Sequence, residues 1–372
     1  MSPKPIKIII SGGGTGGHIY PAVSIANALK AADPTVDILF VGALGRMEME
    51  KVPAAGYPIE GLPIAGLQRE KSLHALVSNL ALPFKIAQSV AQAGRIIDRF
   101  GPQVAVGVGG YASGPLLWSA RRKGIPYLLQ EQNSFAGKTN KMLAYNAFAI
   151  CVAYKGMEQF FPAEKIILTG NPIREGLAPA SAALKAQAQA HFGLDPTKRT
   201  LLVVGGSLGA RTLNKCMAAY LPRAAQENVQ IIWQCGKQGL AGATEAMQAY
   251  PTIPVQLHAF LSRMDLAFAA SDAVISRAGA GTISELCVAG KPCLFVPSPN
   301  VAEDHQTHNA QALVNEGAAL MVRDAEASEK LMDTALTLVR DTAVCERLSN
   351  QIQTLGMPHA AATIAQLILD RV

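Results

Sequence analysis

His18 is the residue whose type and position are best suited to proton transfer. It directly follows the glycine-rich string Ser11–Gly17, which lies between an apolar, strand-like run (Ile6–Ile10) and an amphipathic helical segment. Glycines let the backbone approach a phosphate closely, and the N–H groups of a first helical turn attract anions. A near-neutral imidazole in that turn could take a proton from a substrate hydroxyl. A capping or surface histidine is the alternative interpretation.

The same string also fits the dinucleotide-binding pattern G-x-G-x-x-G through Gly12, Gly14 and Gly17. That interpretation expects an acidic residue at the end of the second strand, where it would hold the ribose of NAD. The predicted second strand, Asp37–Val41, instead continues into Gly42-Ala43-Leu44. The sequence therefore disfavours NAD binding.

A second chemically informative string is Ser276–Leu286, in which a predicted strand ends, a glycine turn follows and a helix begins at Thr282 or Ser284. Glu285 falls in the first turn of that helix. A helix N-terminus favours a pyrophosphate, and a carboxylate one turn in can accept two ribose hydroxyl protons. A capping box that binds no ligand is the alternative.

A polar cluster, Glu303–Asn309, follows the next predicted strand. Asp304, His305 and Gln306 are hydrogen-bonding groups suited to sugar hydroxyls. His305 and His308 could share a helical face as metal ligands, but two histidines alone make a thin site. The chain also has no Asp-x-Asp pair to hold a divalent ion on a pyrophosphate, so we expect no metal.

Short apolar runs alternate with helical patterns along the chain, which predicts an α/β protein with parallel, doubly wound sheets. The succession of strand, glycine loop and helix recurs, because the predicted strand Thr200–Val204 leads into Gly205–Gly209 and a further helix. Two Rossmann-like domains in tandem follow from this repetition. The Ala-rich stretch that ends at Gln189 is the expected linker. The strands are predicted at Ile6–Ile10, Asp37–Val41, Val104–Val108, Tyr127–Gln130, Ala149–Val152, Thr200–Val204, Gln230–Gln234, Val255–His258, Ala273–Ile275 and Pro292–Val296.

The composition agrees with this organisation. The 372 residues are 49% hydrophobic and only 16% charged, which supports two buried cores, and the net charge of +6 suits a protein that meets anions. Six cysteines without a C-x-x-C pair predict reduced, mostly buried thiols of a cytosolic protein. We expect no secretory signal, and prolines and glycines interrupt the one long uncharged stretch, Phe100–Ala120.

The segment Arg69–Lys85 is the candidate for membrane contact. Its apolar residues recur at helical spacing and basic residues flank them, a pattern that favours a shallow contact with anionic lipid. Packing of the same stripe into the core explains the spacing equally well. The proposed patch consists of Leu73, Leu76, Leu80, Phe84, Lys71 and Lys85.

Seven strings in order resemble the MurG family of peptidoglycan N-acetylglucosaminyltransferases, within the GT-B glycosyltransferases. Gln130 departs from the family pattern, which usually has His before Glu-Gln-Asn. The strings are Thr15-Gly-Gly-His-Ile-Tyr-Pro21, Gly109-Gly-Tyr-Ala-Ser-Gly-Pro115, Glu131-Gln-Asn133, Gly170-Asn-Pro-Ile-Arg174, Gly205-Gly-Ser-Leu-Gly-Ala210, Arg277-Ala-Gly-Ala-Gly-Thr-Ile-Ser-Glu285 and Asp304-His-Gln-Thr-His-Asn-Ala310.

The resemblance implies a GT-B architecture of two Rossmann-like domains facing a cleft. Residues 1–172 would form an N-terminal domain for the acceptor and the membrane, and residues 173–356 would bind the donor UDP-GlcNAc. The C-terminal helix (357–372) is expected to pack back on the first domain. The implied reaction is an inverting transfer of GlcNAc to the C4 hydroxyl of undecaprenyl-pyrophosphoryl-MurNAc-pentapeptide (lipid I), which gives lipid II. Such an enzyme is a UDP-GlcNAc-dependent hexosyltransferase without an obligatory cofactor.

The resemblance also assigns site residues. His18 is the expected base, Leu261 is expected beside the uracil, and Arg174 and Ser207 are expected at the leaving phosphates. His305 and Gln306 would contact the sugar, and Glu285 the ribose. The complete set of expected donor contacts is Thr15, Gly16, Gly17, Asn133, Arg174, Ser207, Leu261, Ala280, Gly281, Thr282, Ile283, Ser284, Glu285, His305 and Gln306.

The expected partners are UDP-GlcNAc, lipid I, an anionic membrane surface and other cell-wall synthesis and division proteins, with no nucleic acid. The expected location is peripheral, on the cytoplasmic face of the inner membrane. Two alternatives stay open: another UDP-sugar transferase or epimerase of the same fold, and a non-catalytic nucleotide-binding protein.

Overall fold

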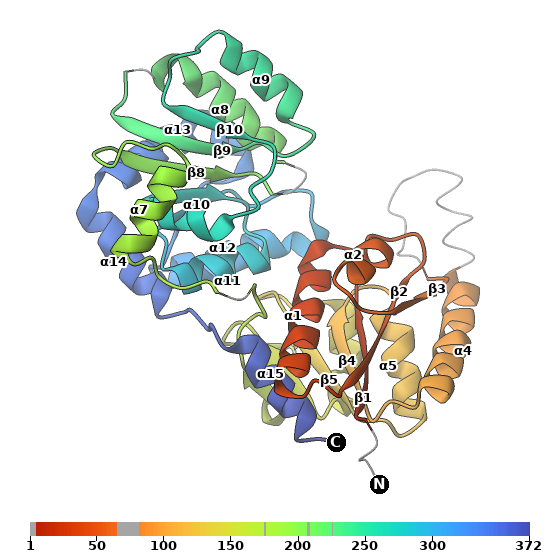
Figure 1. Ribbon diagram of the computed structural model, residues 1–372. Helices are drawn as coiled ribbons and strands as arrows, with labels where there is room; N and C mark the ends of the chain where they lie inside the picture. Colours follow the sequence, from red (N-terminus) through yellow and green to blue (C-terminus); the bar gives the residue numbers. More distant parts are fainter. Residues whose placement is uncertain (1–4, 65–81, 175, 207–208, 225) are drawn as a thin grey trace. The chain divides into compact units, whose positions relative to one another are not determined.

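Two parallel β-sheets, each with helices on both faces, organise the chain (Figure 1). The computed structural model describes residues 5–64, 82–174, 176–206, 209–224 and 226–372. Unit 1 comprises Met1–Ile173 together with His359–Val372, and unit 2 comprises Arg174–Pro358.

The sheet of unit 1 has the strand order β3-β2-β1-β4-β5-β6-β7, and all of its paired strands are parallel. The chain therefore starts in the middle, runs to one edge and then crosses back to the other, which is double winding. The strands are β1 (Lys7–Gly12), β2 (Asp37–Ala43), β3 (Ile59–Leu62), β4 (Val104–Gly109), β5 (Tyr127–Glu131), β6 (Ala149–Val152) and β7 (Ile166–Leu168). The helices are α1 (Gly16–Ala32), α2 (Glu48–Ala54), α4 (Leu82–Phe100), α5 (Ser113–Arg122), α6 (Lys138–Leu143) and α15 (Ala360–Leu369).

Alternate residues of β1 bury their side chains on opposite faces of this sheet. Ile9 belongs to the core that α4, α5 and α6 cover, while Ile8 and Ile10 pack with α1 and α15. Both faces are covered, so the central strands are apolar throughout instead of alternating. The C-terminal helix α15 packs against α1 through residues that include Ile364 and Ile368.

Unit 2 repeats the design with the order β10-β9-β8-β11-β12-β13, again parallel. Its strands are β8 (Arg199–Val204), β9 (Val229–Gln234), β10 (Val255–His258), β11 (Ala273–Ser276), β12 (Cys293–Phe295) and β13 (Leu320–Met321). Its helices are α7 (Ala182–His191), α8 (Arg211–Ala224), α9 (Leu240–Gln248), α10 (Met264–Ala270), α11 (Ala280–Ala289), α12 (His305–Asn315), α13 (Ala327–Arg340) and α14 (Thr342–Gln353).

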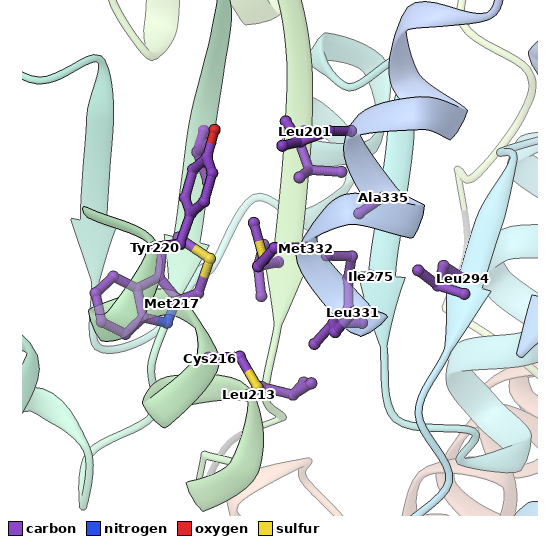
Figure 2. Close-up of a cluster of buried hydrophobic side chains, with 14 of the residues drawn as sticks. Leu201, Leu213, Cys216, Met217, Tyr220, Ile275, Leu294, Leu331, Met332 and Ala335 are labelled. Carbon is purple, nitrogen blue, oxygen red and sulfur yellow. The ribbon is translucent and has the colours of Figure 1, made fainter. Parts of the chain in front are cut away.

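Helices α8 and α13 pack on one face of the second sheet. Figure 2 shows Leu213 and Met217 of α8 and Leu331 of α13 close to Leu201 and Ile275 of the strands. Burial of such side chains supplies the main driving force for folding, about 25 cal/mol per Å² of apolar area. The two units thus have separate cores, as two folding domains require.

Every segment predicted as a strand forms one, with ends shifted by a residue or two. The prediction missed the edge strands β3, β7 and β13, because β3 contains Gly61, β7 has only three partly exposed residues and β13 has only two residues. The prediction that the Ala-rich stretch is a linker was wrong in part. From Ala182 it forms α7, which Ser181 caps by accepting the Leu184 N–H (3.1 Å) and which packs against α10.

All six cysteines are buried and free. Burial raises the pKa of the Cys151 and Cys287 thiols to about 12. Such thiols stay protonated and unreactive at neutral pH. Among the described residues, no helix has the length and apolar character needed to cross a bilayer.

Candidate active site

The first glycine loop joins the end of β1 to the start of α1. Thr15 is the extended N-cap residue, α1 begins at Gly16, and Gly14 has a φ of +85°. A positive φ disfavours any residue with a Cβ, so glycine is required at that position. The loop therefore ends in a helix N-terminus whose first turn contains His18.

The His18 imidazole is oriented by its own loop. Nδ1 lies 3.0 Å from the carbonyl oxygen of Gly13 and 3.4 Å from Oγ1 of Thr15. Because a carbonyl oxygen only accepts, the proton of the shorter hydrogen bond belongs to Nδ1. In the neutral ring, Nε2 then carries the lone pair that a base needs.

The glycine string after β4 packs directly on the first loop. Gly109 (φ +104°) and Gly110 (φ +92°) adopt conformations that favour glycine. A Cβ on Gly109 would lie 2.6 Å from Cδ2 of His18, and one on Gly110 would lie 2.4 Å from the Gly13 carbonyl oxygen. The two strings, about a hundred residues apart, thus form one closely packed edge of the sheet.

The string after β5 is held by the buried carboxylate of Glu131. Its oxygens accept hydrogen bonds from the Asn133 backbone N–H (3.1 Å), the Gly137 N–H (3.0 Å) and Nδ2 of Asn140 (2.9 Å). Gln130, the departure from the family pattern, is fully buried and donates to Oδ1 of Asn171 (2.9 Å). Asn133 is therefore fixed at the same sheet edge as His18.

In unit 2 the structure brings Arg174 and Glu285 together. Nε of Arg174 donates to Oε1 of Glu285 at 2.6 Å, with the two side chains 48% and 13% exposed. Burial raises the pKa of Glu285, and the adjacent guanidinium opposes that shift. From the sequence, Arg174 was expected at the leaving phosphates and Glu285 at the ribose, and their contact was not predicted.

Helix α11 begins immediately after the glycine turn that follows β11. Gly279 is its extended N-cap residue, and Ala280, Gly281, Thr282, Ile283 and Ser284 form the first turn and a half. The helix therefore begins two to four residues before the predicted start at Thr282 or Ser284, and Glu285 lies in its second turn, not in the first. The first backbone N–H groups of the helix, those of Ala280, Gly281 and Thr282, have no acceptor within the helix and attract an anion, whereas the Ile283 N–H donates to the Gly279 carbonyl (2.9 Å).

Helix α12 supports the neighbouring loop. Oε1 of Gln306 accepts the Ser298 N–H (2.8 Å), and Nδ2 of the buried Asn309 reaches the Ala278 carbonyl (3.5 Å). His305 is the first residue of α12. Leu261, expected beside the uracil, is buried after β10. Hydrogen bonds thus join α12 to the loops that follow β11 and β12 within unit 2.

Two buried or partly buried side chains, Arg277 in unit 2 and Glu48 in unit 1, were not found from the sequence. Arg277 donates to Asp324 (2.5 Å) and to the carbonyls of Val296 (3.0 Å) and Pro297 (3.1 Å). These bonds connect the loops after β11 and β12 to the short 3₁₀ helix η5 (Asp324–Glu326). The buried Glu48 lies beneath the first glycine loop. No sequence signal identifies either partner, because each contact joins distant parts of the chain.

Some expected residues lie outside the described ones: Ser207, Lys71, Leu73, Leu76 and Leu80. Of the membrane patch, Phe84 is 73% exposed at the start of α4 and Lys85 is partly buried. Within the described ranges, no group of three His, Cys, Asp or Glu side chains is arranged to hold a metal ion.

Two Rossmann-like units in tandem, with glycine loops and helix N-termini at the carboxyl edges of both sheets, define the GT-B class of glycosyltransferases. Residues 8–152 match the glycosyltransferase family 28 N-terminal domain and residues 200–364 its C-terminal domain. The chain belongs to the MurG family within this class.

The similarity to individual members extends over the whole chain. Two relatives align with 98% of this chain and with 98% of their own length. Both are named UDP-N-acetylglucosamine–N-acetylmuramyl-(pentapeptide) pyrophosphoryl-undecaprenol N-acetylglucosamine transferase. That of Parabacteroides distasonis is 53% identical over 366 residues, and that of Bacteroides thetaiotaomicron 55% over 368. The crystal structure of Acinetobacter baumannii MurG covers 98% of this chain and 100% of its own, with 28% identity and a TM-score of 0.80.

Proposed function

We propose that the protein transfers GlcNAc from UDP-GlcNAc to the C4 hydroxyl of undecaprenyl-pyrophosphoryl-MurNAc-pentapeptide, with inversion at the anomeric carbon. The observation that carries this proposal is the match, at 53% and 55% identity over 98% of the chain, to proteins named for that reaction. The site geometry supports it, because a base candidate and an anion-attracting helix start each lie at the carboxyl edge of a sheet.

His18 acts as the general base on the acceptor hydroxyl. Its Nδ1 bonds to the Gly13 carbonyl, so Nε2 is the atom that takes the proton. The C4 oxygen then attacks the anomeric carbon, the new glycosidic bond forms on the opposite face, and UDP leaves with the electrons of the broken bond. Thr15, Gly16 and Gly17 of the same loop, and Asn133 after β5, are the proposed donor contacts of unit 1.

Unit 2 stabilises the leaving diphosphate without a metal. The N-terminal turn of α11, Ala280–Ser284, presents backbone N–H groups, and Arg174 supplies a cation whose Nε is already held by Glu285. Preorganised donors of this kind stabilise charge that develops in the transition state. Ser207 is a further proposed phosphate contact, and Leu261 is the proposed neighbour of the uracil.

The protein is proposed to work peripherally on the cytoplasmic face of the inner membrane, where its lipid acceptor would lie. The exposed Phe84 supports a surface patch, and Trp118, also exposed, carries the Arg121 guanidinium 5.7 Å from its ring centre. Other cell-wall synthesis and division proteins are proposed as partners at this location.

The first prediction tests the reaction and its base together. Radiolabelled UDP-GlcNAc should release UDP only when the lipid-linked muramyl acceptor is present. His18→Ala should lower kcat about a hundred- to ten-thousand-fold, because positioned proton transfer contributes that much, while UDP-GlcNAc still binds. His359→Ala, a change outside the proposed site, is the matched control. Turnover without acceptor would contradict the proposed reaction, and an undiminished kcat in His18→Ala would remove His18 from it.

The second prediction concerns Glu285, the proposed ribose contact. Glu285→Gln keeps the shape but loses a charge-assisted bond worth about 1.5–3 kcal/mol, so calorimetry should show UDP and UDP-GlcNAc binding roughly ten- to hundred-fold more weakly. Glu329→Gln, an exposed site on α13, is the control. Unchanged UDP affinity would show that the carboxylate has another role.

The same pair predicts a pH dependence. Burial raises the pKa of Glu285, so the carboxylate is protonated as pH falls through a value above the ordinary glutamate range. UDP affinity should therefore decline in the wild type from a higher pH than in Glu285→Gln. Titration of the UDP phosphates contributes to both plots of UDP affinity against pH, so subtracting the Glu285→Gln plot from the wild-type plot isolates the effect of Glu285. Parallel curves would contradict this assignment.

The third prediction concerns recognition of the sugar. Gln306 uses its Oε1 to hold the Ser298 N–H, which leaves its NH₂ group as the proposed donor to a sugar hydroxyl beside His305. A site built to bond a hydroxyl discriminates strongly against the epimer that misplaces it. Gln306→Ala should therefore narrow the preference for UDP-GlcNAc over UDP-GalNAc in kcat/KM. An intact preference would show that other groups distinguish the epimers.

The fourth prediction concerns the membrane. The protein should sediment with anionic vesicles at low salt and be released as salt screens the charges, since each nearby cation contributes about 1 kcal/mol. Leu76→Glu/Phe84→Glu should abolish this binding and the activity on the long-chain acceptor, whereas Leu240→Glu on α9 should not. A double variant that unfolds would place the stripe in the core, and a folded one that still binds would place the contact elsewhere.

A further inference from the structure

Glu48, the first residue of α2, is a buried carboxylate to which the proposed reaction gives no role. It is 1% exposed, and among the residues that the structure describes no Lys or Arg side chain forms an ion pair with it. Its Oε2 accepts the Gly14 N–H at 2.8 Å, and its Oε1 accepts the Ala43 N–H at 3.0 Å. A buried carboxylate is costly unless its oxygens are hydrogen-bonded, so these two backbone donors stabilise it. Glu48 thereby joins the end of β2 to the first glycine loop.

The Glu48 side chain packs closely against the first glycine loop and against β2. A Cβ on Gly13 would lie 2.2 Å from Oε1 of Glu48, and a Cβ on Gly42 would lie 2.6 Å from its Cγ. On its other side the loop meets Gly110, whose Cβ would lie 2.4 Å from the Gly13 oxygen. The peptide that links Gly13 to Gly14 is held between the carboxylate and the second glycine string.

That single peptide unit also bonds to His18. Its N–H points to Glu48, and its carbonyl oxygen, which belongs to Gly13, accepts from Nδ1 of His18 at 3.0 Å. A trans peptide is planar, with N–H and C=O pointing in opposite directions. An anion at the N–H end polarises the unit and makes the carbonyl a better acceptor. A chain of two hydrogen bonds therefore runs from the Glu48 carboxylate through the Gly13–Gly14 peptide to the His18 imidazole.

We infer that Glu48 is the positioning residue of His18, acting through the Gly13–Gly14 peptide to fix the Nδ1-protonated tautomer and the direction of Nε2. This inference rests on the proposed role of His18 as base. In a Ser-His-Asp triad the carboxylate bonds directly to the imidazole and holds its tautomer. Here a peptide bond lies between the two groups and transmits the same constraint. Because Glu48 is buried, it cannot offer its oxygens to a ribose.

The test compares Glu48→Gln with Glu50→Gln, its exposed neighbour on the same helix. The Gly14 and Ala43 N–H groups bond to different carboxylate oxygens, and a carboxamide replaces one of these oxygens with an NH₂ donor, so one of the two N–H groups loses its acceptor. In ¹⁵N-histidine NMR, the wild-type His18 ring should be protonated at Nδ1. In Glu48→Gln this tautomer should lose population, and the pH at which the ring titrates should fall. Glu50→Gln should match the wild type.

Activity gives a second readout. Glu48→Gln should lower kcat about ten- to a hundred-fold, the scale expected for a misplaced catalytic group, with the KM for UDP-GlcNAc within about two-fold. In the His18→Ala background it should cause no further loss. Additive losses, or a folded Glu48→Gln protein with wild-type His18 resonances, would overturn the inference.

Two further outcomes are distinguishable. If His18→Ala alone leaves kcat unchanged, the proposed base is wrong, and the NMR measurement still decides whether Glu48 fixes the imidazole. If Glu48→Gln does not fold, Glu48→Asp replaces it, since it keeps the charge but is one methylene shorter. A folded Glu48→Asp protein with an unaltered His18 tautomer and kcat would then count against the inference, and a perturbed tautomer would support it.

Discussion

The close approach of two backbone segments at the carboxyl edge of the first sheet is the constraint on which the His18 site depends. β1 and β4 pair in parallel, so the loops that follow them meet, and Gly13 and Gly110 come together at distances that no Cβ permits. Such contact requires that backbone polar groups find partners, because buried N–H and C=O groups are costly when unpaired. The Gly13–Gly14 peptide finds one partner on each side, Glu48 and His18.

The second unit uses a carboxylate beside a helix start in a different way. Glu285 lies on α11 and pairs with a guanidinium, whereas Glu48 accepts hydrogen bonds from the backbone N–H groups of Gly14 and Ala43. Burial raises the pKa of Glu285, and Arg174 only partly opposes it. A carboxylate that is partly exposed beside its cationic partner is accessible to a ligand. One bonded on both oxygens within the backbone is suited to holding a fixed geometry.

The elements of both sheets were predictable because parallel strands buried on both faces are continuous apolar runs, and the loops at their ends contain glycine. The two Rossmann-like domains followed from the same signals used twice. The resemblance to the MurG family implied the GT-B class, and the comparisons confirm that class. The edge strands β3, β7 and β13 were missed because short, partly exposed strands lack that run. Helix α7 was missed because an Ala-rich stretch has little periodicity, and its packing against α10 decides its place.

The sequence by itself determined which residues stand at the ends of strands and the starts of helices, among them His18 and Glu285. Those positions depend on local periodicity and on glycine, which the sequence displays directly. Only the tertiary structure decided what each side chain contacts. Arg174 reaches Glu285 across 111 residues, and Glu48 reaches Gly14 across 34. Hydrogen-bond partners depend on how elements pack in three dimensions, and that packing leaves no periodic trace in the sequence.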